Sequence, residues 1–394
     1  MSSAERAPGA TRLTDGDAPA DVVIVGGGIM GCASALALAD AGVRALVLER
    51  AVPGAEASSH AAGILGPAIE ARGGASLRLG QRSLALHAQL AERFRAEHDL
   101  EVGFSRCGLL EVALDEAEAA RLVAREAALR ATGVRVERLD GAAARALEPS
   151  LSPGVEAALL LPDEAQIEPP RLLRALAVAA ERAGVRFRTG EVVRGVVHQG
   201  GRVRGVALEG GLLEARTVVV AAGSWTSLID GVPLAREVVY PVRGQLVATV
   251  TRPPVFRRVV FGAGGYVLTR PDGRALCGST EERVGFERGV TLGGLSAVLA
   301  TATRLAPSLA GARVLDHWSS FRPGTMDDLP LVGPTDVDGL FLATGHFRNG
   351  ILLGPVTGEV IARAVTGAAL DPDALGLDPR RTNRTAPRGG GTAG

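Results

Sequence analysis

Two glycine-rich turns contain residues that could bind the phosphates of a nucleotide cofactor. The first, GGGIMG at Gly26–Gly31, follows the apolar run 21–25. Gly26 permits a tight bend, Gly28 lets a pyrophosphate approach the backbone, and Gly31 allows close packing of helix on strand. Glu49 ends the next apolar run, where a carboxylate can accept hydrogen bonds from ribose hydroxyls. The spacing predicts a dinucleotide site, and by itself it does not distinguish FAD from NAD.

The second turn lies near the other end of the chain. Its sequence, GHFRNG at Gly345–Gly350, directly follows the apolar run Leu340–Thr344. Each turn is expected to join a strand to a helix whose first N–H groups can face negative charge. Between the turns, the run 218–222 leads into Gly223, and these small residues would allow a close pass by a cofactor. Together the turns indicate one long cofactor that contacts both ends of the sequence.

The flanking patterns predict the elements that position these turns. Asp21–Gly26, Ile29–Ala41 and Ala45–Glu49 form an expected strand–helix–strand unit, the usual setting of a dinucleotide fingerprint. Helical spacing continues at Ser76–Glu97, Asp115–Ala131, Pro170–Ala183 and Gly354–Val365. A β-meander is predicted from three strands separated by Gly-Gly turns: Glu191–His198, Arg202–Leu208 and Thr217–Ala222.

The composition argues against several classes of protein. Basic and acidic residues balance, 43 against 43, so no global charge favours nucleic acid or an anionic membrane. No apolar stretch approaches the roughly 20 residues of a membrane span, and residues 1–20 lack the apolar core of a secretory signal. Three widely spaced cysteines fit a reduced, cytoplasmic protein, and no spaced metal-binding motif is present.

All 43 basic residues are arginines, because the sequence contains no lysine. This excludes a Schiff-base lysine and a phosphate-loop lysine.

Five stretches point to a known family: GGGIMG with Glu49, SSHAAGIL at 58–65, PVRGQ at 241–245, FRPGTMDDLPLVG at 321–333 and ATGHFRNGILLGPVTG at 343–358. Over residues 21 to 368 the chain resembles the D-amino-acid-oxidase-type family of FAD amine oxidases. Within that family it is most similar to the glycine oxidases of thiamine-thiazole biosynthesis. The last stretch is the most specific, since few other families join GHxRNG to a helix in this way.

The resemblance implies an α/β fold with an α+β substrate domain. A Rossmann-like FAD-binding domain of the glutathione-reductase type would comprise 21–80, 150–232 and 320–368. An antiparallel-sheet substrate domain would comprise 81–149 and 233–319, so that both domains are discontinuous. Residues 1–20 and 371–394 are rich in Gly, Pro, Ala, Asp and Arg, and we expect both ends to be disordered.

The resemblance also implies which residues hold FAD. Ile29, Met30, Glu49 and Arg50 would lie at the adenosine and pyrophosphate, and Val193 would meet the adenine through its backbone. Ser58, Ala62, Gly63 and Ile64 would follow the flavin. His346, Phe347, Arg348, Asn349, Gly350, Ile351 and Leu352 would border the isoalloxazine, with a helix that starts near Gly354 aimed at its pyrimidine side. Ser319-Ser320 replace the cysteine that attaches FAD in some relatives, so FAD is expected to be non-covalent.

Three residues are expected to contact the substrate. In the family, the arginine of the FRPGT motif, here Arg322, binds the amino acid's carboxylate, and a planar guanidinium suits a carboxylate bidentately. Arg348 would stand next to the same pocket. Tyr266 matches a pocket tyrosine whose phenol could bind the carboxylate, although a half-buried sheet tyrosine is an equal alternative. His87, on a charged helix, is expected to be solvated.

The implied activity is FAD-dependent oxidative deamination of glycine, with sarcosine and D-amino acids as further substrates. The products would be the imino or 2-oxo acid (glyoxylate from glycine), ammonia and hydrogen peroxide, with oxygen as acceptor and a role in thiamine biosynthesis. Some relatives use a lysine to activate oxygen, and this chain has none, so positive charge near the flavin would come from arginine, from a protonated His346 or from the substrate. A homo-oligomer is expected. Two alternatives stay open: a dehydrogenase of the same fold that passes electrons to a quinone or carrier, and a non-catalytic flavin-binding protein.

Overall fold

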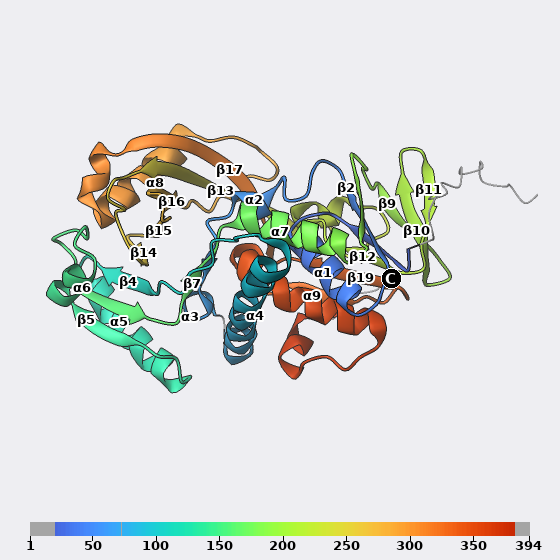
Figure 1. The fold of residues 1–394 in the computed structure, drawn as a ribbon, viewed down its shortest axis with the longest axis horizontal. Coiled ribbons are helices and arrows are strands. Elements are labelled where there is room, and N and C mark those ends of the chain that lie inside the picture. Colours follow the sequence, from blue (N-terminus) through green and yellow to red (C-terminus); the bar gives the residue numbers. More distant parts are fainter. Residues whose placement is uncertain (1–19, 72, 383–394) are drawn as a thin grey trace, which may run out of the picture.

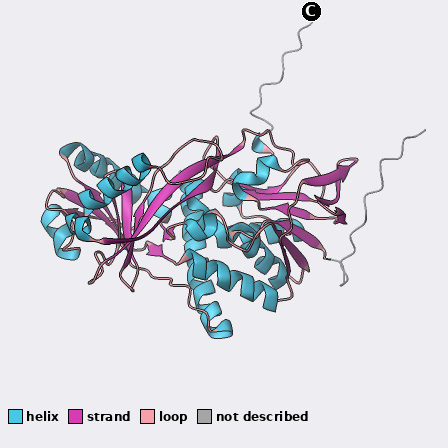
Figure 2. Cartoon of the chain, turned by 90° about the horizontal axis from the view of Figure 1, so that it is seen from above, coloured by secondary structure: helices cyan, strands magenta, loops and turns pink. Residues whose placement is uncertain are grey.

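Two large β-sheets lie side by side along the long axis of the molecule (Figure 1). The computed structural model describes residues 20–71 and 73–382. Seen from above, the two sheets lie at opposite ends of the molecule, with most of the long helices between and around them (Figure 2). The mixed α/β class predicted from the sequence is confirmed, and segments from both ends of the chain meet in one sheet.

The first sheet has the strand order β18-β19-β12-β1-β2-β8. All neighbouring pairs are parallel except β18 with β19. Because both faces of a parallel sheet are covered, its inner strands β1 and β12 consist of continuous buried apolar residues. The bounds are β1 Val22–Val25, β2 Ala45–Glu49, β8 Arg186–Thr189, β12 Val218–Val220, β18 Leu331–Pro334 and β19 Leu340–Thr344.

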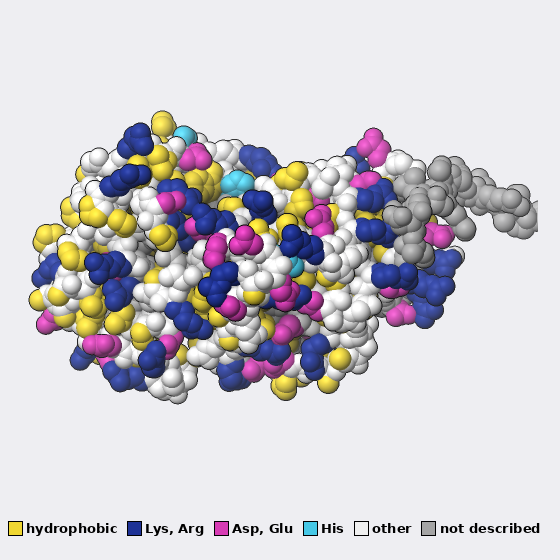
Figure 3. All heavy atoms as spheres, viewed as in Figure 1, with side chains coloured by type: hydrophobic (Ala, Val, Ile, Leu, Met, Phe, Trp, Pro, Cys, Tyr) yellow, Lys and Arg dark blue, Asp and Glu magenta, His cyan; other side chains and the backbone are white. Residues whose placement is uncertain are grey.

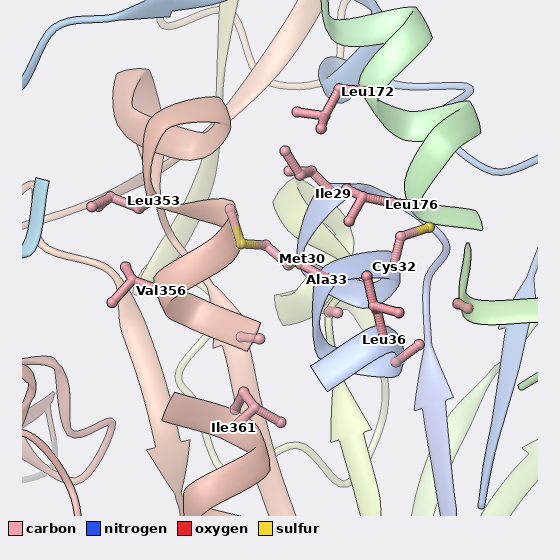
Figure 4. Close-up of a cluster of buried hydrophobic side chains, with 14 of the residues drawn as sticks. Ile29, Met30, Cys32, Ala33, Leu36, Leu172, Leu176, Leu353, Val356 and Ile361 are labelled. Atoms are coloured by element: carbon pink, nitrogen blue, oxygen red, sulfur yellow. The ribbon is translucent and has the colours of Figure 1, made fainter. Parts of the chain in front are cut away.

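Beside this sheet, α1 (Ile29–Asp40) packs against both α7 (Pro169–Arg182) and α9 (Gly350–Thr366). Their apolar side chains interdigitate in one buried cluster (Figure 4). A Cβ atom at Gly358 would lie 2.5 Å from the Ala33 carbonyl oxygen, so glycine lets α9 approach the backbone of α1. The packing places the helix that follows the second turn against the helix that follows the first.

The second sheet has the order β17-β13-β16-β15-β14-β4-β6-β5 and is antiparallel apart from the pair β14·β4. Its long strands are β13 (Val239–Val250) and β17 (Arg313–Thr325), and the others are β4 Leu109–Ala113, β5 Glu137–Asp140, β6 Ala157–Leu161, β14 Val259–Gly262, β15 Gly265–Thr269 and β16 Arg274–Gly278. β6 lies in a range expected for the cofactor domain, yet it pairs with β4 here. The remaining domain boundaries stay a prediction.

The predicted meander is wrong in its third strand. β9 (Gly195–Gln199), β10 (Arg202–Leu208) and β11 (Gly211–Glu214) form the three-stranded antiparallel sheet. The run Val218–Val220 instead becomes β12 and pairs in parallel with β1 and β19. A fully apolar run is typical of a buried parallel strand, and this difference from the alternating β10 decides its place.

Two further expectations are corrected at the C-terminal end. The last helix begins at Gly350, not near Gly354, after a 3-10 turn η3 (Phe347–Asn349). Residues 371–382 are ordered, since η4 (Pro372–Leu377) buries Ala374 and Leu377 in the core beside α4. The other residues expected to be disordered, 1–19 and 383–394, lie outside the described residues.

The remaining elements connect or cover the sheets. They are α2 Ala57–His60, β3 Ile64–Leu65, α3 Pro67–Glu70, α4 Gly74–His98, α5 Glu116–Ala131, α6 Gly141–Leu147, β7 Ala165–Gln166, η1 Gly223–Leu228, α8 Leu292–Leu305 and η2 Pro307–Gly311. Basic and acidic side chains intermix on the face shown in Figure 3. Within the described residues, no helix is long and apolar enough to cross a membrane, and no cluster of metal-ligating side chains is found.

Candidate active site

One cavity of about 430 Å³ connects the two sheets. At one end it meets the carboxyl ends of β1, β2 and β12, where cofactors bind in open α/β sheets. At the other end it is lined by residues of β13, β15 and β17. Gly28 and Gly350 both line it, so the two glycine-rich turns meet in one site.

The first turn has the close packing that its glycines predict. Gly26 has a φ of +104°, and a Cβ atom at Gly31 would lie 1.9 Å from the Gly26 carbonyl oxygen. Glu49 ties the turn to β2, because its carboxylate accepts hydrogen bonds from the Gly27 N–H (2.7 Å) and the Ala51 N–H (2.9 Å). Each carboxylate oxygen keeps further acceptor capacity, so Glu49 can still accept a ribose hydroxyl.

The start of α1 presents backbone N–H groups to the cavity. The Ile29 N–H donates to Ser58 Oγ at 3.0 Å, and both residues line the cavity together with Gly28 and Met30. A helix N-terminus favours negative charge, which makes this the place for a pyrophosphate. Ser58 of α2 therefore contacts the start of α1, and its place along the flavin stays a prediction.

An aromatic surface lies at the same end of the cavity. The Arg50 guanidinium stacks 4.0 Å over the ring of Trp225 and is paired with Glu56. Arg288 also pairs with Glu56 (2.7 Å) and reaches the rings of Trp225 and Phe321. The sequence analysis assigned no role to Trp225, Glu56, Arg288 or Phe321. No local pattern distinguishes these residues, because their contacts join segments far apart in the sequence.

The stretch Ala62-Gly63-Ile64 passes along the cavity in a shape that needs glycine. Gly63 has a φ of +82°, and a Cβ atom there would lie 2.1 Å from the Ile167 carbonyl oxygen. Arg270, which sequence reasoning missed, supports this stretch by donating to the Ala62 carbonyl (2.6 Å) and to Gln166 Oε1 (2.9 Å). Burial lowers the pKa of Arg270 to about 10, and the residue stays cationic at neutral pH.

His346 lies buried at the second turn, with 2% of its surface exposed. Its Nε2 lies 2.9 Å from Thr357 Oγ1, whereas its Nδ1 has no partner among the described residues. Burial lowers the pKa of His346 to about 3, so the ring is neutral at physiological pH. The suggestion that a protonated His346 supplies positive charge is therefore wrong.

The expectation for His87 is also wrong. It is fully buried, not solvated, and its Nε2 donates to the Ile351 carbonyl at 2.8 Å. Burial lowers the pKa of His87 to about 4. The imidazole and Ser83, whose hydroxyl donates to the Leu352 carbonyl (2.6 Å), hold the start of α9 in place.

Arg322 reaches the cavity from β17 across the face of the second sheet. It donates to the Thr280 carbonyl (3.1 Å) and to Ser279 Oγ (2.7 Å). Among the described residues it has no carboxylate within ion-pair distance, and burial lowers its pKa from the usual range. A Cβ atom at Gly244 would lie 2.2 Å from Arg322 Nη1, so glycine in β13 makes room for the guanidinium.

Tyr266 faces the same space from β15. It is 7% exposed and lines the cavity, so it is more buried than the half-buried alternative, and its contact with substrate stays a prediction. Burial raises the pKa of its phenol, although the neighbouring Arg322 and Arg348 act in the opposite direction. A Cβ atom at Gly278 would lie 2.7 Å from Tyr266 Oη. Glycine inside a strand often marks such a close approach, and this signal was available in the sequence.

Arg348 lines the same cavity but is already paired. Its Nε and Nη2 donate to the two carboxylate oxygens of Glu70 (3.0 and 2.9 Å), and its Nη1 pairs with Glu281. Burial acts to lower the pKa of Arg348, and the two carboxylates more than offset it, so the net pKa is raised. Arg348 is permanently charged and neutralised by its neighbours.

The lining of the cavity suits FAD in its chemistry. It runs from the start of α1, where helix N–H groups favour phosphate, to the second glycine turn, and the glycine positions keep backbone open to a close ligand. Near the second turn, His346 Nδ1 is a buried polar atom without a partner in the described residues, and such atoms normally have one. These features fit a bound flavin, and the residues that would hold it come from both glycine turns.

Most of the predicted site residues share this cavity. The lining includes Gly26, Gly28, Ile29, Met30, Glu49, Arg50, Ser58, Ala62, Gly63, Ile64, Val193, Gly223, Tyr266, Arg322, His346, Phe347, Arg348, Gly350 and Ile351. Gly31, Asn349 and Leu352 are absent from it. Gly31 packs on Gly26, and Leu352 lies near Gly80 of α4, so both act behind the cavity wall.

The sequence of this chain is similar to those of known proteins. The profile of the DAO family, described as FAD dependent oxidoreductase, matches residues 21–364. The glycine oxidase of Geobacillus kaustophilus is 35% identical over 350 residues, covering 88% of this chain and 92% of that protein. The bifunctional protein ThiO/ThiG of Trichormus variabilis is 33% identical over 89% of this chain. The chain spans about half, 53%, of the length of that ThiO/ThiG protein.

The fold agrees with these sequence matches. The crystal structure of glycine oxidase from Geobacillus kaustophilus superposes with a TM-score of 0.87 at 34% identity, covering 92% of this chain and 98% of that one. The family profile spans both glycine turns and the strands between them. The chain therefore belongs to the DAO family of FAD-dependent oxidoreductases.

Proposed function

We propose that this protein catalyses the FAD-dependent oxidative deamination of glycine and other small amino acids. The products are the imino or 2-oxo acid, ammonia and hydrogen peroxide. One observation supports this most strongly: Arg322 presents a guanidinium without a carboxylate partner to the cavity that both glycine turns line. A substrate carboxylate would complete its pairing. Similarity to the glycine oxidase of Geobacillus kaustophilus supports glycine as the substrate.

In this proposal the protein contributes binding, orientation and exclusion of water. Bound FAD supplies the hydride acceptor. Arg322 pairs with the substrate carboxylate, and the Tyr266 hydroxyl donates a second hydrogen bond to it. Phe261 and Leu246 line the same end of the cavity and keep water from it. Fixed charge in a water-poor site orients the substrate more strongly than the same contacts would in water.

The test is a screen of purified protein with glycine, sarcosine, D-alanine and D-proline. Ammonia and hydrogen peroxide are measured in air, and loss of the bound flavin's absorbance is measured separately in the absence of oxygen. We expect glycine to give all three signals. If the flavin absorbance stays unchanged with all four amino acids, the proposal is overturned and a flavin-binding protein without turnover is favoured.

The cofactor is proposed to be non-covalent. No cysteine occurs among the described residues that line the cavity, whereas Ser320, which the resemblance matches to the flavin-attaching cysteine of some relatives, does line it. Cys32, the cysteine nearest to the first turn in sequence, is buried and donates to the Gly27 carbonyl. Acid precipitation should release all of the FAD into the supernatant.

A second candidate differs only in the electron acceptor. The chain has no lysine, and His346 is neutral, so two sources of positive charge near a flavin are missing. This favours a dehydrogenase that passes electrons to a quinone or carrier. Hydrogen peroxide formation in air supports the oxidase, whereas turnover only with an artificial dye supports the dehydrogenase.

The similarity to ThiO/ThiG proteins supports a role in thiamine-thiazole biosynthesis, which we include in the proposal. Complementation of a strain that lacks its own glycine oxidase for thiazole formation would test it. The homo-oligomer expected from the sequence stays a prediction, and light scattering of the purified protein would determine it.

A further inference from the structure

The substrate end of the cavity contains two guanidinium groups in opposite states. Arg322 is held by a hydroxyl and a carbonyl, which are neutral. Arg348 is held by the carboxylates of Glu70 and Glu281. These two acids come from α3 and from the segment after β16, and neither was singled out by its sequence context.

Together, Arg348, Glu70 and Glu281 form a cluster with a negative formal charge. Arg348 contributes +1, while Glu70 and Glu281 contribute −1 each, which sums to −1. Glu70 uses both carboxylate oxygens on Nε and Nη2, and Glu281 takes Nη1, so the donor positions of the fork are largely occupied. The Arg348 side chain is 31% exposed, and Arg348 and Glu70 both line the cavity.

We propose that Glu70 and Glu281 make the pocket selective for amino acids with a single carboxylate, by keeping the Arg348 guanidinium from binding a second one. This rests on the proposed function, in which Arg322 receives the α-carboxylate. A ligand with a second carboxylate would place that group near Arg348, since both arginines line one cavity beside Tyr266. There it would find an occupied fork and two like charges, and like charges at close range oppose binding.

The proposal explains why this pocket keeps two arginines yet suits a small substrate. A fork with a free edge would bind carboxylates bidentately wherever they reach it. The ion pairs with the two acids prevent Arg348 from acting as a second anion-binding site. Removal of the acids should allow Arg348 to bind an anion, so Glu70 and Glu281 are specificity-determining residues that act through Arg348.

The test compares two ethers that cannot be deaminated. Methoxyacetate has one carboxylate and has the shape of sarcosine, and diglycolate adds a second carboxylate at its other end. Their dissociation constants for the FAD-loaded protein are measured by calorimetry. We expect the wild type to bind methoxyacetate about tenfold or more tightly than diglycolate. The preference should shrink in Glu281→Gln and reverse in the double variant Glu70→Gln/Glu281→Gln.

Two variants control for side effects. Glu281→Asp keeps the charge and should keep the preference for methoxyacetate. Glu287→Gln removes a nearby acid whose side chain is 71% exposed and which does not contact Arg348, and it should leave the ratio of the two constants unchanged. FAD content and the thermal midpoint verify that each variant is folded. If the double variant is not folded, the single Glu281→Gln variant is sufficient for the test.

The outcomes separate this inference from the proposed function. Equal binding of both ethers by the wild type, or an unchanged ratio in Glu281→Gln, overturns the role of the two acids and leaves glycine oxidation standing. Failure of the wild type to bind either ether overturns both, because Arg322 then receives no carboxylate.

Discussion

The two arginines of the cavity differ in what surrounds them, although both occur in motifs that the sequence analysis selected. Arg322 lies among neutral donors and acceptors, and its charge is available to a ligand. Arg348 lies between two carboxylates, and its charge is already balanced. A motif can therefore place an arginine in a site without deciding whether that arginine binds the substrate. The partner groups decide it.

The largest effect is expected from removing the available charge. Arg322→Ala should lower kcat/KM for glycine about 30- to 5000-fold, because loss of one member of a desolvated charge pair costs about 2–5 kcal/mol. Steady-state kinetics checks this, with FAD content as the measure of an intact cofactor site. Arg322→Lys should recover only part of the activity, since an ammonium does not reproduce the planar fork. Normal glycine turnover by Arg322→Ala would contradict the difference between the arginines.

A smaller effect is expected at the paired arginine. Arg348→Ala leaves Glu70 and Glu281 without their shared cation, and their charges then repel the substrate carboxylate. We expect KM for glycine to rise about tenfold, with a smaller change in kcat. The triple variant Arg348→Ala/Glu70→Gln/Glu281→Gln should recover most of the loss. A loss as large as that of Arg322→Ala would mean that both arginines bind the substrate directly.

Tyr266 tests the hydrogen bond beside Arg322. Tyr266→Phe keeps the buried ring, which contacts Phe261, and removes only the hydroxyl. One neutral hydrogen bond contributes about 1 kcal/mol, so KM should rise about fivefold. Binding of methoxyacetate should weaken by the same factor. An unchanged constant would show that the phenol faces the carboxylate without donating to it.

The smallest effect is expected from protonation of His346. Its pKa is lowered to about 3, so the ring stays neutral from pH 5 to 8. The dissociation constant of methoxyacetate should therefore depend on pH in the same way in the wild type and in His346→Gln over this range. The same lowering makes folding depend on pH. The unfolded chain binds the proton near the usual pKa of 6.5 and the folded chain does not, so stability is complete above pH 6.5 and falls as the pH drops toward 3. Urea unfolding at pH 5 and pH 7 should show a smaller loss in His346→Gln than in the wild type.

The local parts of the fold could be predicted because their causes are local. A glycine that must adopt a positive φ, such as Gly26, and an apolar run such as Val22–Val25 are readable in neighbouring residues. The helices α1, α4, α5, α7 and α9 were also predicted, with boundary shifts of a few residues, whereas α8 was not. The third meander strand was not, because the partner of Val218–Val220 is β1, far away along the chain.

The sequence by itself determined the family, the cofactor turns and the arginine of the FRPGT motif, since these depend on residue types at short spacing. Tertiary structure alone decided that Glu70 and Glu281 meet at Arg348 and that His87 and His346 are buried. The physical reason is that charge pairing and desolvation depend on distances between packed segments. Residues 70, 281 and 348 become neighbours only when α3, the segment after β16 and the second glycine turn are packed together.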